Sequence, residues 1–205
     1  MSSKAEDEID QSGLRDRADR RVRADAQRNL DALLQAAKAV FATSGVDAPV
    51  REIAERAGLG VGTVYRHFPQ RSDLIAAVFR REIDACAAEA PILAAEYPPF
   101  EALARWMQRY AAFIATKRGL ATALHSGNPA FDPLPAYFQQ RLQPAFRALL
   151  DSAAAAGEIR AGVDPEDLLG AVASLCMSSH NDGPGRAERM VALLVDGLRY
   201  GTSHR

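Results

Sequence analysis

Side chains that can form hydrogen bonds cluster in one short stretch of the chain. Gly62, Thr63, Arg66 and His67 are small or polar, and the aromatic Tyr65 lies beside them. We expect these residues on the outward face of a short helix. Such a face suits the major groove of DNA, where polar side chains reach base edges. The alternative is an ordinary helical hairpin at the protein surface.

The residues upstream supply the turn that such a helix needs. Two short helices that cross steeply require a small residue where they meet, and Ala54 can fill that place. A tight turn requires a positive φ, which Gly58 adopts without strain. Apolar residues predicted to pin the unit to its core are Ile53, Ala57, Leu59 and Val64. The Ala-x-x-x-Gly spacing is common by chance, so the prediction depends on its combination with the polar face.

Charge is unevenly distributed along the chain. Residues 14–71 carry eleven Lys or Arg against seven Asp or Glu (11 − 7 = +4), whereas residues 1–13 sum to −3 and residues 72–205 to −2. Arginines cluster ahead of the first apolar helix at Arg15, Arg17, Arg20, Arg21, Arg23 and Arg28. A basic arm of this kind suits a polyanion such as DNA. A solvated helix face explains it equally well.

Nearly every periodic segment has the helical period, and none alternates as a strand does. The first helix has apolar residues over 30–41 and is expected to end near Ser44 and Gly45. Punctuation by proline, glycine and capping residues predicts further helices over 48–57, 61–68, 72–96, 100–116, 120–125, 136–156, 164–179 and 186–200. The sequence therefore predicts an all-α fold of about nine helices.

Catalytic and metal-binding patterns are not found in the sequence. The four histidines, His67, His125, His180 and His204, lack metal-ligand spacing with cysteines or acids. There is no phosphate-binding loop, no Gly-x-Ser-x-Gly and no other nucleophile set. We therefore expect that the protein is not an enzyme and that it binds neither a cofactor nor a metal.

Targeting signals are also not found. Cys86 and Cys176 stand among apolar residues and are expected to be small buried side chains in a reducing cytosol. The polar start MSSKAEDEIDQSG does not resemble a signal peptide, and no long uncharged apolar run predicts a membrane span. The expected location is the cytoplasm.

One segment resembles a known family. VREIAERAGLGVGTVYRHFPQRSDLIAAVF is similar to the N-terminal signature of TetR (tetracycline-repressor-like) regulators, and the similarity covers about residues 25–80. TKRGLATAL is similar to the SbtR-like subgroup of C-terminal domains. The resemblance implies a ligand-responsive homodimeric repressor that binds a near-palindromic DNA operator. It also implies a flexible arm over residues 1–22, a helix-turn-helix domain over 23–72, and an effector-binding and dimerisation domain over 73–205.

The resemblance also implies roles for single residues. Arg51 would reach a guanine edge, Arg66 at a variable position would read sequence, and Arg71 matches a phosphate-binding lysine. The full set of implied DNA-binding residues is Arg51, Gly62, Thr63, Tyr65, Arg66, His67 and Arg71, with Arg21 and Arg23 from the arm. Packing of Tyr65 against Phe41 remains an alternative. Gly60 departs from the family, in which many members have Ser or Thr at that helix cap.

A ligand cavity in the C-terminal part is a further implication. Its candidate lining is Trp106, Tyr110, Phe113, Leu124, His125, Tyr137, Phe138 and His180. The alternative, that the aromatic residues simply form the core, stays open for each of them.

The last two helices show a broad apolar surface. Its residues are Leu168, Leu169, Val172 and Leu175, then Met190, Val191, Leu194, Val195 and Leu198. A terminal helix that is apolar over this width needs a partner, and a two-fold copy of itself is the simplest one. An all-helical protein-interaction module would explain this surface too, but it gives no purpose to Thr63, Arg66 and His67.

Overall fold

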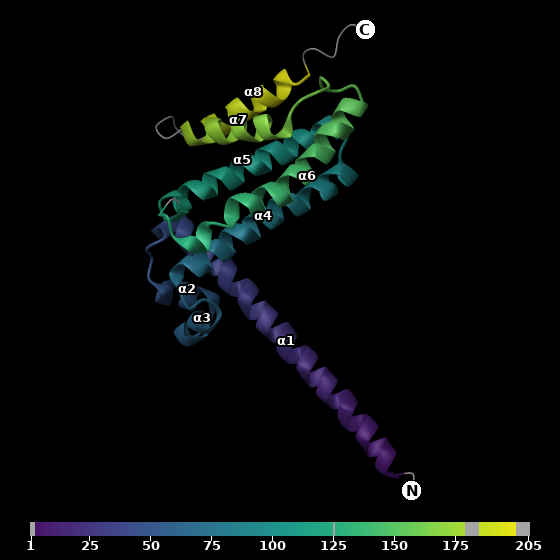
Figure 1. Ribbon diagram of the computed structural model, residues 1–205, viewed down its shortest axis with the longest axis vertical. Coiled ribbons are helices and arrows are strands. Elements are labelled where there is room, and N and C mark those ends of the chain that lie inside the picture. The colour runs from purple at the N-terminus through teal and green to yellow at the C-terminus, as the bar shows by residue number, and fades with distance from the viewer. Residues whose placement is uncertain (1–2, 125, 179–184, 200–205) are drawn as a thin grey trace. The chain divides into compact units, whose positions relative to one another are not determined.

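The computed structural model describes residues 3–124, 126–178 and 185–199. Over these residues the chain forms eight α-helices, one short 3-10 helix and no strand (Figure 1). The all-α prediction is therefore confirmed. The chain divides into two compact units, Met1–Arg71 and Ser72–Arg205, which are described separately below. The predicted domain roles and boundaries stay predictions.

The first unit contains α1 (Ser3–Ser44), α2 (Val50–Ala57) and α3 (Val61–His67). Helix α1 packs against α2, and α2 packs against α3. The apolar residues with helical spacing are buried as expected, namely Leu33, Leu34, Ala37, Val40 and Phe41 of α1, with Ile53, Ala54 and Val64. The predicted helix end at Ser44 is also confirmed.

Helix α1 begins far upstream of its apolar residues. The sequence predicts an arm over residues 1–22, whereas the backbone is helical from Ser3. Helical hydrogen bonds close within four residues, so a helix can extend where it has no apolar stripe. Ala, Arg and Leu, which are good helix formers, are frequent in residues 14–44, and this segment contains neither Gly nor Pro. The flexibility of residues 1–22 stays a prediction.

The second unit comprises α4 (Arg71–Glu96) from its second residue onward, α5 (Pro99–Leu124), the 3-10 helix η1 (Pro129–Phe131), α6 (Leu134–Ala155), α7 (Pro165–Ser178) and α8 (Arg186–Gly197). Helix α5 packs against α6, α7 and α8, and α7 lies beside α8 (Figure 1). No described helix combines the length and the apolar composition of a membrane span.

The predicted count of about nine helices is close to the observed one. Segments 100–116 and 120–125 form the single helix α5, so the described residues contain eight α-helices rather than nine. Gly119 lies inside this helix. A glycine there costs only about 1 kcal/mol relative to alanine, which the helix formers on both sides offset.

A ladder of aromatic rings fills the core of the second unit. The Trp106 ring stacks on Phe146 at 5.0 Å and on Tyr110 at 5.7 Å between centroids, and Phe79 meets Phe113 at 5.4 Å. Such pairs contribute about 0.5–1.5 kcal/mol beyond the burial of their area. Residues from α4, α5 and α6 are joined in this way.

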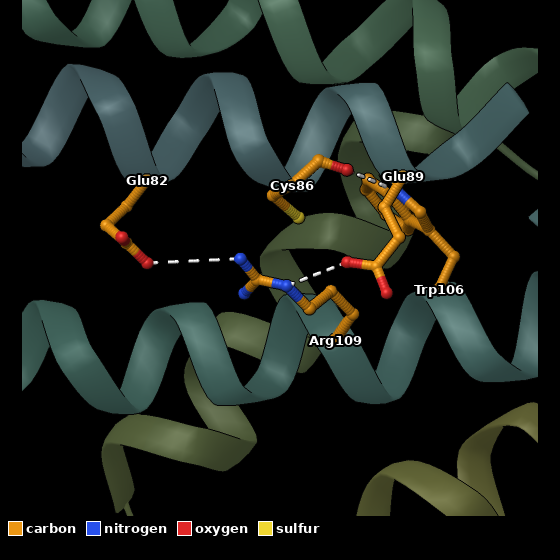
Figure 2. Close-up of polar contacts among 5 residues, drawn as sticks. All are labelled: Glu82, Cys86, Glu89, Trp106 and Arg109. Carbon is orange, nitrogen blue, oxygen red and sulfur yellow. Dashed lines mark hydrogen bonds and ion pairs between the residues drawn. The ribbon is translucent and has the colours of Figure 1, made fainter. Parts of the chain in front are cut away.

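A charged contact fixes α4 against α5 (Figure 2). Glu82, Cys86 and Glu89 share one face of α4, and Arg109 of α5 lies between the two carboxylates. Arg109 Nε is 2.9 Å from Glu89 Oε2, and Nη2 is 3.9 Å from the buried Glu82 Oε2. Trp106 Nε1 donates to the Cys86 carbonyl at 2.9 Å. These directional contacts set the register of the two helices.

Both cysteines are free and buried, as predicted. Burial raises the pKa of the Cys86 thiol to about 12. Below that pH the thiol stays neutral and unreactive, since the thiolate is the nucleophilic form. Cys86 therefore acts as a small apolar core residue.

The apolar surface predicted for the last two helices is largely used inside the unit. Leu168, Leu169, Val172, Val191, Val195 and Leu198 are all buried in the single chain. Leu175, Met190 and Leu194 are half-buried. The sequence pattern could not separate these positions from the outward ones, because α7 and α8 pack on α5 as well as on each other. The large apolar side chains left exposed here are Met177 at 43% and Leu193 at 74%.

The buried position of Glu82 predicts a large effect of removing its partner. Arg109→Ala should lower the free energy of unfolding by about 3 kcal/mol, because it removes the guanidinium that pairs with the buried Glu82 carboxylate. Arg105→Ala on the same helix is the control, since Arg105 pairs with Glu101 in solvent. Urea denaturation of both variants measures the difference. Equal changes in the two variants would contradict the structural role of Arg109.

Candidate nucleic-acid interface and ligand cavity

The turn between α2 and α3 is a left-handed helix cap. Gly58 has φ 67° and ψ 28°, which confirms the positive φ predicted for it. Gly58 N–H donates to the Glu55 carbonyl at 3.1 Å and Leu59 N–H to the Ala54 carbonyl at 2.9 Å. These two bonds form a Schellman motif, which satisfies the last carbonyls of α2.

Helix α3 divides its residues between the core and solvent. Val64 is 1% exposed, whereas Gly62, Tyr65, Arg66 and His67 are exposed, and Thr63 is half-buried. Tyr65 is 51% exposed, which favours the outward role over burial against Phe41. The outward polar face thus exists as the sequence predicts. Its contact with DNA stays a prediction.

The start of α3 has no side-chain cap. Gly60 is the N-cap residue, with φ −74° and ψ 144°, and its carbonyl accepts from Thr63 N–H at 2.9 Å. The first N–H groups of a helix lack intrahelical partners. Because Gly60 offers them no side-chain acceptor, α3 lacks the small stabilisation that Ser or Thr would give at this position.

The arginines predicted to bind DNA differ in their surroundings. Arg51 lies in the first turn of α2, and its Nε donates to Glu55 Oε1 at 2.9 Å in an exposed pair. An exposed pair of this kind is weak and leaves the guanidinium accessible to another anion. Arg21 and Arg23 are exposed on α1, and Arg28 pairs with Asp25.

Arg71 has a structural partner that the sequence did not reveal. Its guanidinium donates to the carbonyls of Val46 and Ala48, in the connection between α1 and α2. Arg71 is half-buried there. These bonds hold Arg71 against that connection within the first unit, and its contact with phosphate stays a prediction.

The second unit contains a cavity of about 420 Å³. This volume lies within the range of small-molecule sites, about 300–1,000 Å³. The cavity is bounded by α4, α5, η1, α6 and α7, through Phe79, Tyr110, Ile114, Leu124, Phe131, Leu134, Pro135, Phe138, Gln139, Gln143, Glu166, Leu169, Gly170 and Ala173. Tyr110, Leu124 and Phe138 are the sequence-predicted lining residues that the structure brings together here.

The other predicted lining residues lie elsewhere. Trp106 and Phe113 are buried in the aromatic core. Tyr137 faces α4, where its hydroxyl donates to Asp84 Oδ2 at 2.7 Å; Arg141 Nε is 2.7 Å from the other oxygen, Oδ1. His125 and His180 lie outside the described residues.

Sequence reasoning missed the polar groups of the cavity, Gln139, Gln143 and Glu166. Gln139 and Gln143 are one helical turn apart on α6, a spacing that equally fits a solvated face. Glu166 belongs to the predicted start of α7, where Asp164 Oδ1 accepts its N–H at 2.7 Å. No group of three potential metal ligands occurs among the described residues.

A helix-turn-helix unit followed by an all-helical unit with a cavity defines a class of bacterial regulators. Comparison of the sequence with models of known protein families gives the same class. The model of the TetR family of bacterial regulatory proteins matches residues 33–78, and that of the SbtR-like C-terminal domain of transcriptional regulators matches residues 98–200. The chain belongs to the TetR family.

Solved structures and curated proteins are similar to it. A TetR transcriptional regulator from Streptomyces coelicolor has 41% identity and a TM-score of 0.72, over 82% of this chain and 97% of that one. A TetR protein from Mycobacterium vanbaalenii has 36% identity and a TM-score of 0.67, over 87% and 99%. An HTH-type transcriptional regulator of Staphylococcus aureus (strain USA300) is 38% identical over 64 residues, which are 31% of this chain and 35% of that relative. The chain thus matches about a third of the curated relative's length.

The exposed position of Arg66 predicts a role in sequence preference. Arg66→Ala should alter the ranking of DNA sites more than general affinity, because one base contact contributes about 1–3 kcal/mol of discrimination. Binding to a selected site and to its single-base variants measures the ranking. Arg56→Ala, an exposed arginine of α2, is the control. An unchanged ranking for Arg66→Ala would exclude it as a reader.

Proposed function

We propose that this protein is a homodimeric repressor of transcription that binds a near-palindromic DNA operator and responds to a small-molecule effector. The observation that carries the proposal is the exposed polar face of α3, which directly follows the left-handed turn at Gly58. Family membership supports the same conclusion. Its place of action would be the cytoplasm, where bacterial DNA lies.

In this proposal α3 enters the major groove. Arg66 reads base edges, Tyr65 and His67 contact phosphates, and Gly62 and Thr63 allow close approach of the backbone. Two copies of α3 would address half-sites about 34 Å apart, or a multiple of that distance.

The dimer would form through α7 and α8. Leu193 of α8 and Met177 of α7 are large apolar side chains left in solvent, at 74% and 43% exposure. Their burial against a two-fold copy would remove this surface from water, while Arg186 and Arg189 lie in the exposed first turns of α8. The proposed interface thus has an apolar centre and charged residues nearby.

The cavity would hold the effector. Phe79 places α4 at the cavity wall, and α4 begins at Arg71, which binds the connection ahead of α2. An effector that displaces α4 would therefore move Arg71 and, through it, the connection between α1 and α2. A coupling of about 1–3 kcal/mol, typical of allosteric proteins, changes operator affinity about 5- to 150-fold.

Recovery of bound DNA tests the proposal directly. Genomic fragments retained by the purified protein should share a near-palindromic sequence. Gel shifts with such a fragment should weaken steeply between about 50 and about 200 mM salt, because phosphate contacts release counterions. Retention without any shared sequence, or no shift at low salt, would exclude a sequence-specific regulator and favour a protein-interaction module.

Leu193 provides a separate test of the dimer. Leu193→Glu should convert the dimer into a monomer, because it places a charge at the centre of an apolar interface. Ile92→Glu is the matched control, since Ile92 is 54% exposed on α4. Sedimentation or light scattering gives the mass of each variant. A Leu193→Glu variant with the wild-type mass would place the interface elsewhere.

A further inference from the structure

The cavity wall contains a buried hydroxyl with a weak bond. Tyr110 is 2% exposed, and its hydroxyl donates to the Leu169 carbonyl at 3.4 Å. Hydrogen bonds between hydroxyl and carbonyl oxygens are usually about 2.7–2.8 Å long. The Leu169 carbonyl lies inside α7, where the helical N–H four residues later also bonds to it. The Tyr110 hydroxyl therefore retains most of its capacity to donate to another acceptor.

This hydroxyl is a donor at any physiological pH. Burial raises the pKa of Tyr110 above its ordinary value, because the phenolate would lose its hydration. Tyr110 and Leu169, the donor and the acceptor residue of this bond, both line the cavity, so the bond lies at the cavity wall. An acceptor atom at that place would form the stronger bond that the carbonyl does not provide.

The rest of the described lining is mainly apolar, with polar groups toward solvent. Phe79, Ile114 and Phe131 are buried side chains of the wall. Gln139 and Glu166 are exposed, and Gln143 is half-buried. The cavity thus combines an apolar interior, one internal donor, and a rim with amides and a negative charge.

We infer that the effector is an uncharged, largely apolar molecule whose oxygen acceptor, such as a ketone, binds the Tyr110 hydroxyl. The inference rests on the proposed function, because it assigns the chemistry of the same effector site. A carboxylate would lose its hydration in the apolar interior and meet repulsion from Glu166 at the rim. An ammonium could pair with Glu166, but it offers no acceptor to Tyr110.

Trp106 provides a built-in reporter of occupancy. It is the single tryptophan of the chain, and its ring stacks on Tyr110 with 5.7 Å between centroids and 5° between planes. A molecule bound against Tyr110 should change the emission of Trp106. The same titration can be followed by the shift in the unfolding midpoint, which any bound molecule raises.

The test compares three probes of equal chain length on the full protein without DNA: octan-2-one, octanoate and octylamine. Octan-2-one should give a saturable change in emission and bind most tightly. Tyr110→Phe should weaken its binding about three- to tenfold, the effect of one neutral hydrogen bond. Tyr137→Phe is the matched control and should bind as wild type, because its hydroxyl bonds to Asp84 on α4.

Two further variants locate the probe. Gly170→Leu should reduce the saturable change, because it adds a bulky side chain at a residue that lines the cavity. Glu166→Gln should strengthen octanoate binding and leave octan-2-one unchanged, because it removes the charge at nearly constant size.

Three results would overturn the inference. These are wild-type affinity of Tyr110→Phe for octan-2-one, tighter binding of octanoate or octylamine, and no saturable change with octan-2-one at all. Because the titration contains no DNA, these three results would not bear on whether the protein retains DNA fragments. Conversely, if the protein binds octan-2-one through Tyr110 but retains no DNA, the proposed function is contradicted and the inferred chemistry of the cavity occupant is not.

Discussion

The left-handed backbone at Gly58 is the constraint on which the arrangement of α2 and α3 depends. A residue with a Cβ would lose about 1–2 kcal/mol in this conformation. No atom lies within 4 Å of the place where a Cβ would stand, so the requirement is conformational rather than one of space. The turn fixes how α3 leaves α2. It thereby decides that Val64 enters the core while Tyr65 and Arg66 face solvent.

A second constraint operates on α4, which polar contacts hold from two helices. Arg109 of α5 binds its glutamates on one side, and Tyr137 and Arg141 of α6 bind Asp84. Apolar packing is non-directional and tolerates sliding, whereas these bonds tolerate little displacement. Phe79 lines the cavity from this same helix. The helix that the proposed effector would move is therefore also one whose register is specified by polar contacts.

Local features were predictable from the sequence. The turn at Gly58, the cap at Gly60 and the outward face of α3 follow from nearest neighbours, so short patterns contain them. The continuity of α5 through Gly119 could not be predicted from short patterns, because a single glycine ends some helices and is tolerated in others. The start of α1 was missed because a helix needs no apolar stripe to continue.

The cavity was only partly predictable, for a different reason. Trp106 and Phe138 look alike in sequence, yet one is core and the other faces the cavity, because contacts between distant helices decide this. Gln139 and Glu166 resemble solvated residues until α6 and α7 are placed together. Arg71 likewise matches a phosphate ligand by motif, while its bonds to Val46 and Ala48 depend on the fold.

Gly170 is the glycine among the residues that line the cavity. It lies on α7 in an ordinary helical conformation, and the space beyond its Cα is open. Any larger residue except proline would improve the helix propensity there by up to about 1 kcal/mol and would add a side chain at the cavity lining. Under the proposed function, a substitution at this one position would therefore change which effectors fit the cavity, while the exposed face of α3 keeps its residues.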